Sequence, residues 1–492
     1  MALLKLEIPP GIYRHGTDYE GSNRWHESNL IRWEGTSLRP VGGWITRVAD
    51  AIDFAPRGAL TWFDNTHVPH IAAGTYNQLF AFSSAGAVYD ITPTSLTVGS
   101  VDASQNLGYG GFGYGDYAYG TERPSNNVWQ EATSWSLDNW GEYLVACSVD
   151  DGNLYEWQLN TAVVAAPIAN APVDNVALVV TDERFLFALG AGNNPRKVAW
   201  CDRENNTVWT PEATNEAGDI ELNSSGVLMC GVSLRGRTLL LTSNDAHIAI
   251  YAGPPTVYGF ERVGSDCGAI SRLSAVGAFD GAFWMGSNGF FYYDGSSVKS
   301  VKCDVQDYIF GDINTGQISK VSGILNNQFN EIWWFYPSGD SVENNRYVTY
   351  NYKYQHWTFG TLDRTSGCDA GVFSKPIWFD SLGNIYTHET GYSHDSNQAF
   401  VESGPISLAN GDQVMKVTQM IPDEETEGQV TATFKTRFYP NTVETSHGPY
   451  AMDSPTSLRF TGRQIRMRLT GEELTNWRAG IMRLEVVAGG RR

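Results

Sequence analysis

The sequence has little charge and no long apolar run. Charged residues make up only 18% of the 492 residues, whereas 42% are hydrophobic. This balance excludes a disordered chain, which needs low hydrophobicity and high charge. Because no run of about 18 apolar residues occurs, the sequence predicts no transmembrane helix. Met1–Pro10 lacks a charged start followed by a long apolar core, so we also expect no signal peptide.

Cysteine is scarce, and no two cysteines are spaced as a CxxC pair. Isolated cysteines of this kind are typical of a protein made in the cytosol, where thiols stay reduced. We therefore expect single thiols in the core or in turns. The six residues are Cys147, Cys201, Cys230, Cys267, Cys303 and Cys368.

Motifs that carry catalysis are also missing. The chain contains no GxxxxGK[ST], no HExxH and no GxSxG. Carboxylates such as Asp304, Asp307 and Asp312 could act in pairs as general acid and base. However, a chain with 54 acidic residues contains such groups by chance. We predict that the protein is not an enzyme, with no catalytic, cofactor-binding or metal site and no cofactor.

Glycine and aromatic residues dominate what is present. There are 51 Gly, 16 Trp, 24 Tyr and 22 Phe. Aromatic side chains suit pleated, half-buried surfaces, and glycine suits tight turns and bulges. Long Ala, Leu, Glu and Lys stretches with a period of 3.6 residues are almost absent. The composition therefore predicts an all-β protein.

Residues 51–394 repeat a hairpin in which a turn residue is followed by an aliphatic and aromatic strand. The copies lie roughly 35 to 75 residues apart, and propeller blades of about 40–50 residues have this kind of spacing. We predict a β-propeller and favour six blades, with five or seven open. Any large antiparallel protein also has many hairpins, which is the alternative. The six strands are 77–82, 152–157, 246–251, 289–293, 345–350 and 383–387. A seventh pair, 185–189 with 197–200, fits less well.

One turn resembles the Asp box of sialidase-type propellers. Ser148–Tyr155 approaches S-x-D-x-G-x-T-W, with Leu and Tyr in place of Thr and Trp. The box is a structural turn even in enzymes, so one imperfect copy favours a propeller blade and not catalysis. A sialidase would also need arginines gathered at the propeller centre. The candidates are Arg184, Arg196, Arg235 and Arg237.

Two segments look suited to contacts outside the propeller. Residues 1–50 read as an N-terminal arm that packs with the C-terminal domain, and Trp25 and Trp33 are candidate subunit or partner contacts. The Gly/Tyr-rich loop 94–132 interrupts the repeat and could offer aromatic side chains to a neighbour. A floppy surface loop is equally open. Its candidate contact residues are Tyr109, Phe112, Tyr114, Tyr117 and Tyr119.

Residues 395–492 change character and predict a small β-sandwich. Arg466 and Arg468 alternate with Ile465, Met467 and Leu469, which is the period of a strand with one wet face. The strand predicted at Leu3–Ile8 is expected to complete this sandwich, since chain ends often lie close together. Deletion of residues 1–44 is then expected to weaken assembly rather than to unfold the propeller.

The net charge of −20 is unevenly distributed. Residues 459–492 carry eight Arg against three Glu, whereas residues 51–458 carry 20 basic and 45 acidic groups. A domain that grips DNA phosphates would be basic. An acidic surface could instead let DNA slide past, although acidity also keeps a β-rich surface soluble.

Several blocks resemble a known family. Pro9–Trp44 (PPGIYRHGTDYEGSNRWHESNLIRWEGTSLRPVGGW) is similar to the opening of tail proteins from short-tailed bacteriophages and related prophages. Thr133–Cys147 (TSWSLDNWGEYLVAC), the Gly/Tyr loop before it, Trp477–Gly480 and Arg483–Val486 fit the same group. Together these blocks cover about a fifth of the chain, span both ends and keep their order. The family is that of tail nozzle, or packaged-DNA stabilisation, proteins.

This resemblance implies a structural protein of the virion tail, assembled in the host cytoplasm. Six copies would form a homohexameric ring below the head-to-tail adaptor. The ring would close the tail channel, retain packaged DNA and gate its ejection. Its implied partners are other copies of itself, the adaptor, tail fibres or spikes, and passing double-stranded DNA without sequence-specific binding. The alternative is a propeller adhesin, or a glycan-binding or glycosidase protein, used for host adsorption.

Overall fold

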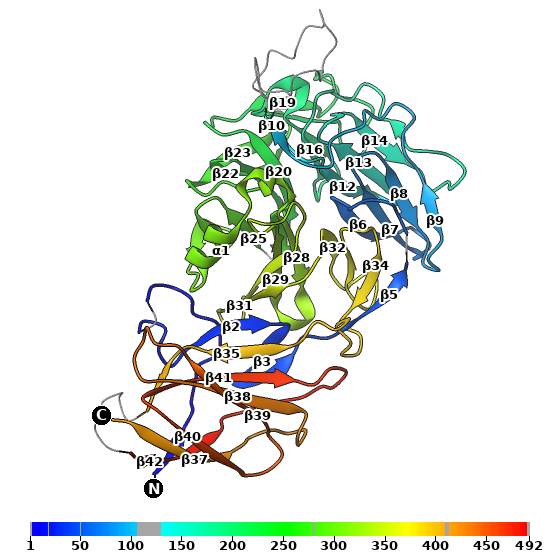
Figure 1. Cartoon of the computed structure of the whole chain (residues 1–492). Coiled ribbons are helices and arrows are strands. Elements are labelled where there is room, and N and C mark those ends of the chain that lie inside the picture. The colour runs from blue at the N-terminus through cyan, green and yellow to red at the C-terminus, as the bar shows by residue number, and fades with distance from the viewer. Residues whose placement is uncertain are drawn as a thin grey trace, which may run out of the picture.

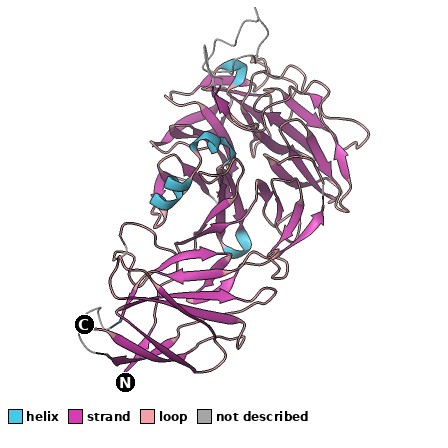
Figure 2. Ribbon diagram, in the orientation of Figure 1, coloured by secondary structure: helices cyan, strands magenta, loops and turns pink. Residues whose placement is uncertain are grey.

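The structure is a computed structural model that describes residues 2–17, 19–49, 51–105, 129–278, 281–408 and 413–489. Strands dominate these residues, with a few short helices (Figure 2). A ring of sheets forms one end of the molecule, and a smaller pair of sheets with both chain termini forms the other (Figure 1). The predicted all-β fold, a propeller with an arm and a sandwich-like domain, is confirmed.

Seven four-stranded antiparallel sheets, called blades 1 to 7, make up the ring in the described residues. Blade 1 contains β6 (Ala59–Phe63), β7 (Pro69–Gly74), β8 (Leu79–Phe82) and β9 (Val88–Asp90). Blade 2 contains β12 (Trp135–Trp140), β13 (Tyr143–Ser148), β14 (Leu154–Trp157) and β15 (Ala166–Pro167). Blade 3 contains β16 (Ala177–Val180), β17 (Leu186–Leu189), β18 (Lys197–Trp200) and β19 (Gly218–Glu221). Blade 4 contains β20 (Leu228–Leu234), β21 (Arg237–Thr242), β22 (Asp245–Gly253) and β23 (Val257–Ser265).

The remaining blades complete the ring. Blade 5 contains β24 (Ala275–Ala278), β25 (Gly281–Gly286), β26 (Gly289–Tyr293) and β27 (Val298–Val301). Blade 6 contains β28 (Ser322–Asn326), β29 (Glu331–Tyr336), β30 (Arg346–Asn351) and β31 (His356–Thr361). Blade 7 contains β32 (Ser366–Cys368), β33 (Ile377–Phe379), β34 (Ile385–His388) and β5 (Trp44–Val48). The first strand of each blade lies beside that of the next, and β32 lies beside β6, so the ring is closed.

Among the described residues the ring has seven blades, which corrects the favoured prediction of six. The hairpin that fits the repeat poorly, β17 with β18, is the centre of blade 3. Its turn runs from Gly190 through the short helix η1 (Ala191–Asn193) to Arg196, so it lacks the tight turn of the other copies. Blade 7 takes its outer strand β5 from the N-terminal segment. Pairing of strands from the two ends of the chain closes the ring.

Two further sheets form the sandwich-like domain. One has the order β1 (Ala2–Lys5), β42 (Arg483–Ala488), β37 (Met415–Ile421) and β40 (Thr456–Gly462). The other has the order β2 (Trp25–Asn29), β35 (Phe400–Ser403), β41 (Gln464–Gly471), β38 (Val430–Arg437) and β39 (Thr445–Ala451), and β36 (Ile406–Ser407) also pairs with β41. Ile465, Met467 and Leu469 of β41 are buried, whereas Arg466 and Arg468 are half-buried, as the period of two predicts.

The sandwich and blades 5 to 7 share one hydrophobic core. Phe290, Trp334 and Trp378 from the blades belong to the same buried cluster as Val417 and Phe434 from the sandwich. Strand β2 lies beside β31, and the Ser28 hydroxyl donates to the Phe359 carbonyl at 2.6 Å. The two parts of the molecule are therefore joined by packing as well as by the chain.

Short elements occupy the connections. These are β3 (Ile31–Glu34), β4 (Ser37–Pro40), β10 (Ser104–Gln105), β11 (Trp129–Gln130), α1 (Gln306–Asp312), η2 (Thr315–Lys320) and η3 (Asn327–Phe329). No helix of the described residues is long and apolar enough to cross a membrane.

Candidate functional site: the capped central channel

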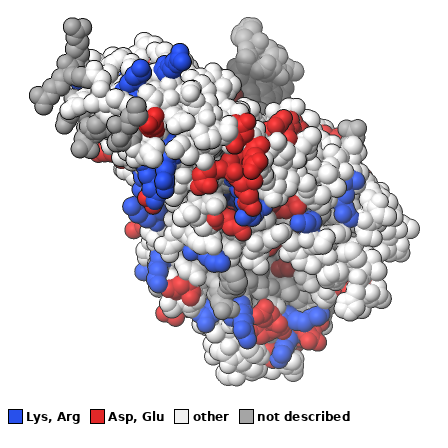
Figure 3. Space-filling model, turned by 90° about the horizontal axis from the view of Figure 1, so that it is seen from below, with Lys and Arg blue, Asp and Glu red and all other residues white. Residues whose placement is uncertain are grey.

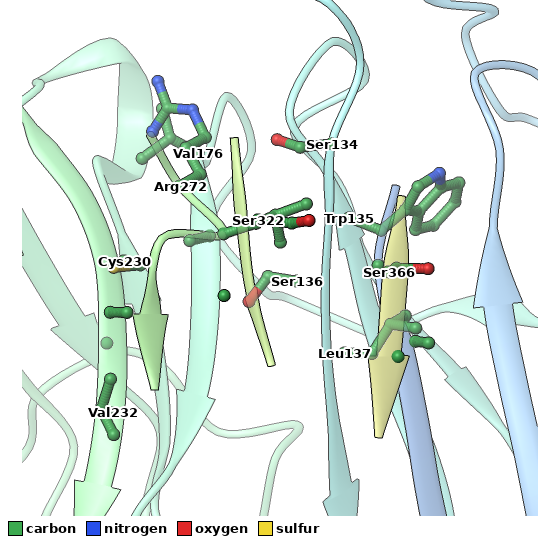
Figure 4. Close-up of a pocket in the computed structure, with 18 residues that line it drawn as sticks. Ser134, Trp135, Ser136, Leu137, Val176, Cys230, Val232, Arg272, Ser322 and Ser366 are labelled. Atoms are coloured by element: carbon green, nitrogen blue, oxygen red, sulfur yellow. The ribbon is translucent and has the colours of Figure 1, made fainter. Parts of the chain in front are cut away.

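The first strands of the blades line a narrow channel along the propeller axis. Its cavity has a volume of about 210 Å³, and its wall carries small side chains such as Ser136, Ser322 and Ser366 (Figure 4). The channel is far too small for a DNA duplex.

Glycine allows the blades to approach so closely. A Cβ added to Gly323 would lie 2.6 Å from Cγ2 of Val276 in blade 5, and one added to Gly367 would lie 2.9 Å from Cδ1 of Ile324 in blade 6. Both distances are shorter than real Cβ contacts allow, so a side chain at either position would push neighbouring blades apart.

One end of the channel is covered by the chain itself. We call residues 102–105 with 129–133 the cap; they include the paired strands β10 and β11. Ala103 exchanges two hydrogen bonds with the Gln317 side chain, at 3.0 and 2.9 Å. The Ala132 N–H donates to the Ser319 hydroxyl at 3.2 Å. The cap starts from the connection between blades 1 and 2, and it is fastened to η2, just before blade 6.

Two ion pairs fasten the cap further. The Lys320 ammonium donates to Asp102 of the cap at 2.5 Å and to Glu343 at 2.8 Å. Lys320 is 0% exposed. Arg272, at the same end of the channel as Ser134 (Figure 4), donates to Glu131 of the cap at 3.1 Å. Arg57 adds a second cation on Glu343. No local sequence pattern predicts this network, because its residues come from four separate connections that meet only in the folded chain.

Cys230 is the thiol among the described residues that line the channel, and it is not activated. Burial raises the pKa of the Cys230 thiol to about 12, so it stays protonated at neutral pH. A protonated thiol is a poor nucleophile and a poor metal ligand. All six cysteines are free thiols. The described residues contain no group of three His, Cys, Asp or Glu side chains placed to hold a metal ion.

The arginines required by a sialidase do not meet in this channel. Arg184 lies over the Trp140 ring, Arg196 pairs with Glu221 of the outer strand β19, and Arg237 donates to the Gly295 carbonyl. Among the four candidates, none lines the described cavity, whose arginine is Arg272. The Asp-box segment forms the turn between β13 and β14. There Asp151 accepts bonds from Asn153 at 2.9 Å and from Tyr155 at 2.6 Å.

The predicted contact residues fall into two groups. Tyr109, Phe112, Tyr114, Tyr117 and Tyr119 lie outside the described residues. Trp25 and Trp33 are buried in the chain, at 6% and 3% exposure, and their ring centroids lie 6.4 Å apart. These two tryptophans thus pack within the shared core. They present little surface to a second subunit.

The N-terminal segment is held by a buried ion triad. The Arg32 guanidinium donates to both oxygens of Glu331, at 3.0 and 2.9 Å, and to both oxygens of Glu389, at 2.9 and 2.6 Å. Arg32 also stacks on the Phe329 ring at 3.6 Å. Burial is the largest single influence on the pKa of Glu389 and acts to raise it. The Arg32 guanidinium and the hydrogen bonds to Glu389 together outweigh burial and hold this pKa below its usual value. At Glu331 burial prevails and raises the pKa.

Fold and channel together define a seven-bladed β-propeller protein with a capped axis. No protein-family model and no curated protein sequence matches the chain. Three solved structures illustrate the fold. Virginiamycin B lyase from Staphylococcus aureus is 6% identical, with a TM-score of 0.41, over 68% of this chain and 95% of its own.

The second structure is BamB from Moraxella catarrhalis. It is 11% identical, with a TM-score of 0.31, over 71% of this chain and 95% of its own. The third is PorZ, a surface component of the type-IX secretion system of Porphyromonas gingivalis. It is 10% identical, with a TM-score of 0.36, over 77% of this chain and 44% of its own. At these identities and TM-scores the likenesses carry no argument about function.

Proposed function

We propose that this chain is a structural virion protein, the tail nozzle of a short-tailed bacteriophage. Copies of it would form a ring that closes the lower end of the tail tube, retains packaged DNA and gates its ejection. The observation that carries the proposal is where the nozzle-like sequence blocks lie in the fold. Among the described residues, the blocks Pro9–Trp44 and Trp477–Gly480 join parts of the molecule, and Thr133–Cys147 lines the channel.

The block Pro9–Trp44 supplies the joint between the two ends of the molecule. It contains β2, which extends a sandwich sheet, and Arg32, which enters the buried ion triad. It ends at Trp44, the first residue of the strand that closes the ring. The ending Trp477–Gly480 meets the same block, because Leu38 and Ala479 exchange backbone hydrogen bonds at 2.9 and 3.0 Å.

The block Thr133–Cys147 begins where the cap ends. Ser134 and Trp135 line the channel, and the block continues through β12 into β13. A resemblance confined to exposed loops would say little about assembly. These segments instead fix how arm, propeller and sandwich are held, which is what a ring subunit requires.

Charge is consistent with DNA that slides and does not bind. Residues 44–388, which make up the propeller, contain 18 Lys and Arg against 36 Asp and Glu. Figure 3 views the molecule from the end that carries the sandwich, and there too acidic side chains gather in one area while basic side chains form several smaller groups. A surface of this sign repels phosphates. Because the propeller channel is too narrow for a duplex, the DNA passage would be the space enclosed by several copies.

Cryo-electron microscopy of the purified particle, or of its tail complex, tests the proposal. We expect density for this chain in a sixfold ring at the distal end of the tail tube. Density at the periphery, or at a tip with another symmetry, would reject the nozzle. It would favour an adhesin, and glycan-array binding and glycan cleavage would then be measured on the isolated chain.

A further inference from the structure

One sheet of the sandwich has an exposed outer face that carries several positively charged side chains. Lys5, Lys416, Arg459 and Arg483 are exposed on the outer face of the β1–β42–β37–β40 sheet, which we call the basic sheet face. Their strand neighbours Leu484, Val417 and Phe460 point inward and are buried. Lys5 pairs with Glu7. Within the described chain, Lys416, Arg459 and Arg483 have no ion-pair partner.

This face carries arrangements that do not stabilise an isolated chain. Lys5 lies directly opposite Arg483 in the ladder. Like charges directly opposite each other destabilise a sheet. Leu3, on the same face, is 56% exposed. Glu485 also lies on this face, and it accepts a bond from the Thr418 hydroxyl at 2.7 Å. A bound acidic surface would offset the repulsion between these cations.

The chain supplies such a surface at the other end of the molecule. Residues 124–183 contain nine acidic residues and no Lys or Arg. Four acidic side chains here lie at or near one rim of blades 2 and 3, and we call them the acidic blade edge: Glu142, Glu156, Asp182 and Glu183. The two turns at this rim are adjacent, since a Cβ on Gly141 would lie 3.0 Å from the Arg184 guanidinium. Arg184 is exposed, so the rim carries one cation beside its four carboxylates, of which Asp182 is exposed and the other three are half-buried.

Apolar side chains accompany these carboxylates. Val163 is 54% exposed and Val164 is 38% exposed. Both line a cavity of about 390 Å³ together with Glu156 and Trp157. The acidic blade edge thus offers carboxylates to the cations of the basic sheet face and exposed apolar side chains to its exposed Leu3. Complementary charge of this kind fixes the partner and its register more than it adds affinity.

We propose that the basic sheet face docks onto the acidic blade edge of a second copy of this chain. Figure 1 places blade 2 and this sheet at opposite ends of the molecule, so one chain cannot satisfy both surfaces. Contact between two different surfaces is heterologous, and such contacts generate closed rings when the rotation between copies closes. The inference rests on the proposed ring of copies and names its contact.

Duplex DNA is the other acidic partner to consider, and the molecule disfavours it. The net charge of −20 repels phosphates at long range. A duplex carries one charge per about 1.7 Å of its axis, whereas this face spaces four cations over four strands. A protein surface with a few carboxylates and apolar side chains fits the face better.

Two charge-reversal variants test the contact. The first carries Lys416→Glu, Arg459→Glu and Arg483→Glu; the second carries Glu142→Lys, Glu156→Lys and Asp182→Lys. Sedimentation velocity of the full chain at low salt should show association for the wild type, its loss in each variant, and its return when the two variants are mixed. The mixture restores one intact pair of surfaces, so its return also shows that both variants are folded.

A matched control carries Arg262→Glu, Lys302→Glu and Lys353→Glu, which are exposed propeller positions with the same change of charge. It should associate like the wild type, and salt should weaken all association. The inference is overturned by a wild type that stays monomeric at its solubility limit, by variants that associate normally, or by a basic-face variant that loses only duplex DNA in a mobility-shift assay.

The outcomes separate this contact from the proposed function. A sixfold tail ring whose subunits touch through other surfaces would reject the contact and keep the nozzle. Salt-sensitive association through these two surfaces, in a chain found outside the tail ring, would reject the nozzle and keep the contact.

Discussion

At the scale of single residues, buried charge fixes how the N-terminal segment is placed. Arg32, Glu331 and Glu389 have side chains only 4% exposed. A buried ion pair is stable only when its geometry satisfies nearly every hydrogen bond, as the four bonds of Arg32 do here. Removal of one partner leaves charges without compensation in a region of low dielectric.

We therefore expect Arg32→Met to lower the free energy of unfolding by about 3–5 kcal/mol. Chemical denaturation followed by tryptophan fluorescence measures the change. The control is Arg196→Met, whose pair with Glu221 is 44% and 48% exposed. Exposed pairs contribute about 0–1 kcal/mol. Equal effects in the two variants would show that the buried triad contributes no more to stability than an exposed pair.

A second residue-scale prediction concerns the glycines between blades. Gly323→Ala places a methyl group 2.6 Å from Val276 and 3.0 Å from the Ser274 carbonyl. Overpacking of this kind costs about 1–3 kcal/mol. Gly311→Ala is the control, because its added methyl group meets nothing within 4 Å. In helix α1 alanine should be neutral or stabilising by up to about 1 kcal/mol. Thermal melting of both variants checks the opposite signs.

At the scale of elements, three buried histidines pack where the N-terminal segment meets the rest of the fold. His356 packs edge-on against Trp33, while His388 stacks on Trp44 at 5.2 Å between ring centroids. His394 lies against Trp44 as well and bonds the Val41 carbonyl at 2.9 Å. Burial lowers the pKa of all three, and that of His356 falls to about 4.

These histidines predict that acid loosens the fold. A histidine in the unfolded chain takes up a proton near pH 6.5, whereas in the folded protein burial keeps these three rings neutral. Below that pH the unfolded state binds more protons, so the free energy of unfolding falls as pH falls. Arg364 donates to His388 Nε2 at 2.9 Å, which further opposes a second positive charge. Above about pH 7 these histidines cause no pH dependence.

Denaturation between pH 7 and 5 measures this slope. Each histidine with a strongly lowered pKa contributes up to about 1.4 kcal/mol per pH unit. His356→Asn should remove its share of the slope between pH 6 and 5. A slope that is the same in wild type and His356→Asn would contradict the prediction.

The cap provides the second prediction at this scale. Lys320→Met removes the ammonium that joins Asp102 to Glu343. We expect faster hydrogen exchange at the amides of Ala103 and Ala132, while the blade strands keep their protection, because local opening requires only the contacts of the cap. Lys302→Met is the control, since Lys302 is 91% exposed. Unchanged exchange in Lys320→Met would show that the remaining bonds suffice to hold the cap.

At the scale of the whole molecule, the N-terminal segment is part of the fold. The sequence alone predicts that loss of residues 1–44 weakens assembly but spares the propeller. The structure changes this expectation. Trp25, Trp33 and Trp44 belong to the shared core, and Trp44 begins the outer strand of blade 7.

We therefore expect that a chain without residues 1–48 cannot fold its propeller, because blade 7 loses a strand and the core loses three tryptophans. Size-exclusion chromatography and circular dichroism should show aggregated or unfolded chain. Deletion of residues 1–8 is the comparison. It removes β1, an edge strand of the sandwich, and the buried Leu6, but no strand of the propeller, so that the propeller should still melt cooperatively. A monomeric, folded product of the longer deletion would contradict this prediction.

Much of the fold was predictable from local pattern. A hairpin can be predicted from a few residues, because turn residues and strand residues alternate within one copy of the repeat. The period of two at Ile465–Leu469 likewise predicted which face of β41 is wet. Blade number was harder, since β5 lies more than 300 residues from its partner β34. No local signal marks such a pair.

The sequence by itself determined the class, an all-β propeller with extra domains, because backbone period and turn chemistry are local properties. It also determined the charge imbalance between the propeller and the C-terminal end. Only the tertiary structure decided that Lys320 and Arg272 fasten the cap, that Trp25 and Trp33 are buried, and that the cations of the sandwich share one face. Each of these depends on residues distant in sequence, which meet only after blades and sheets have packed.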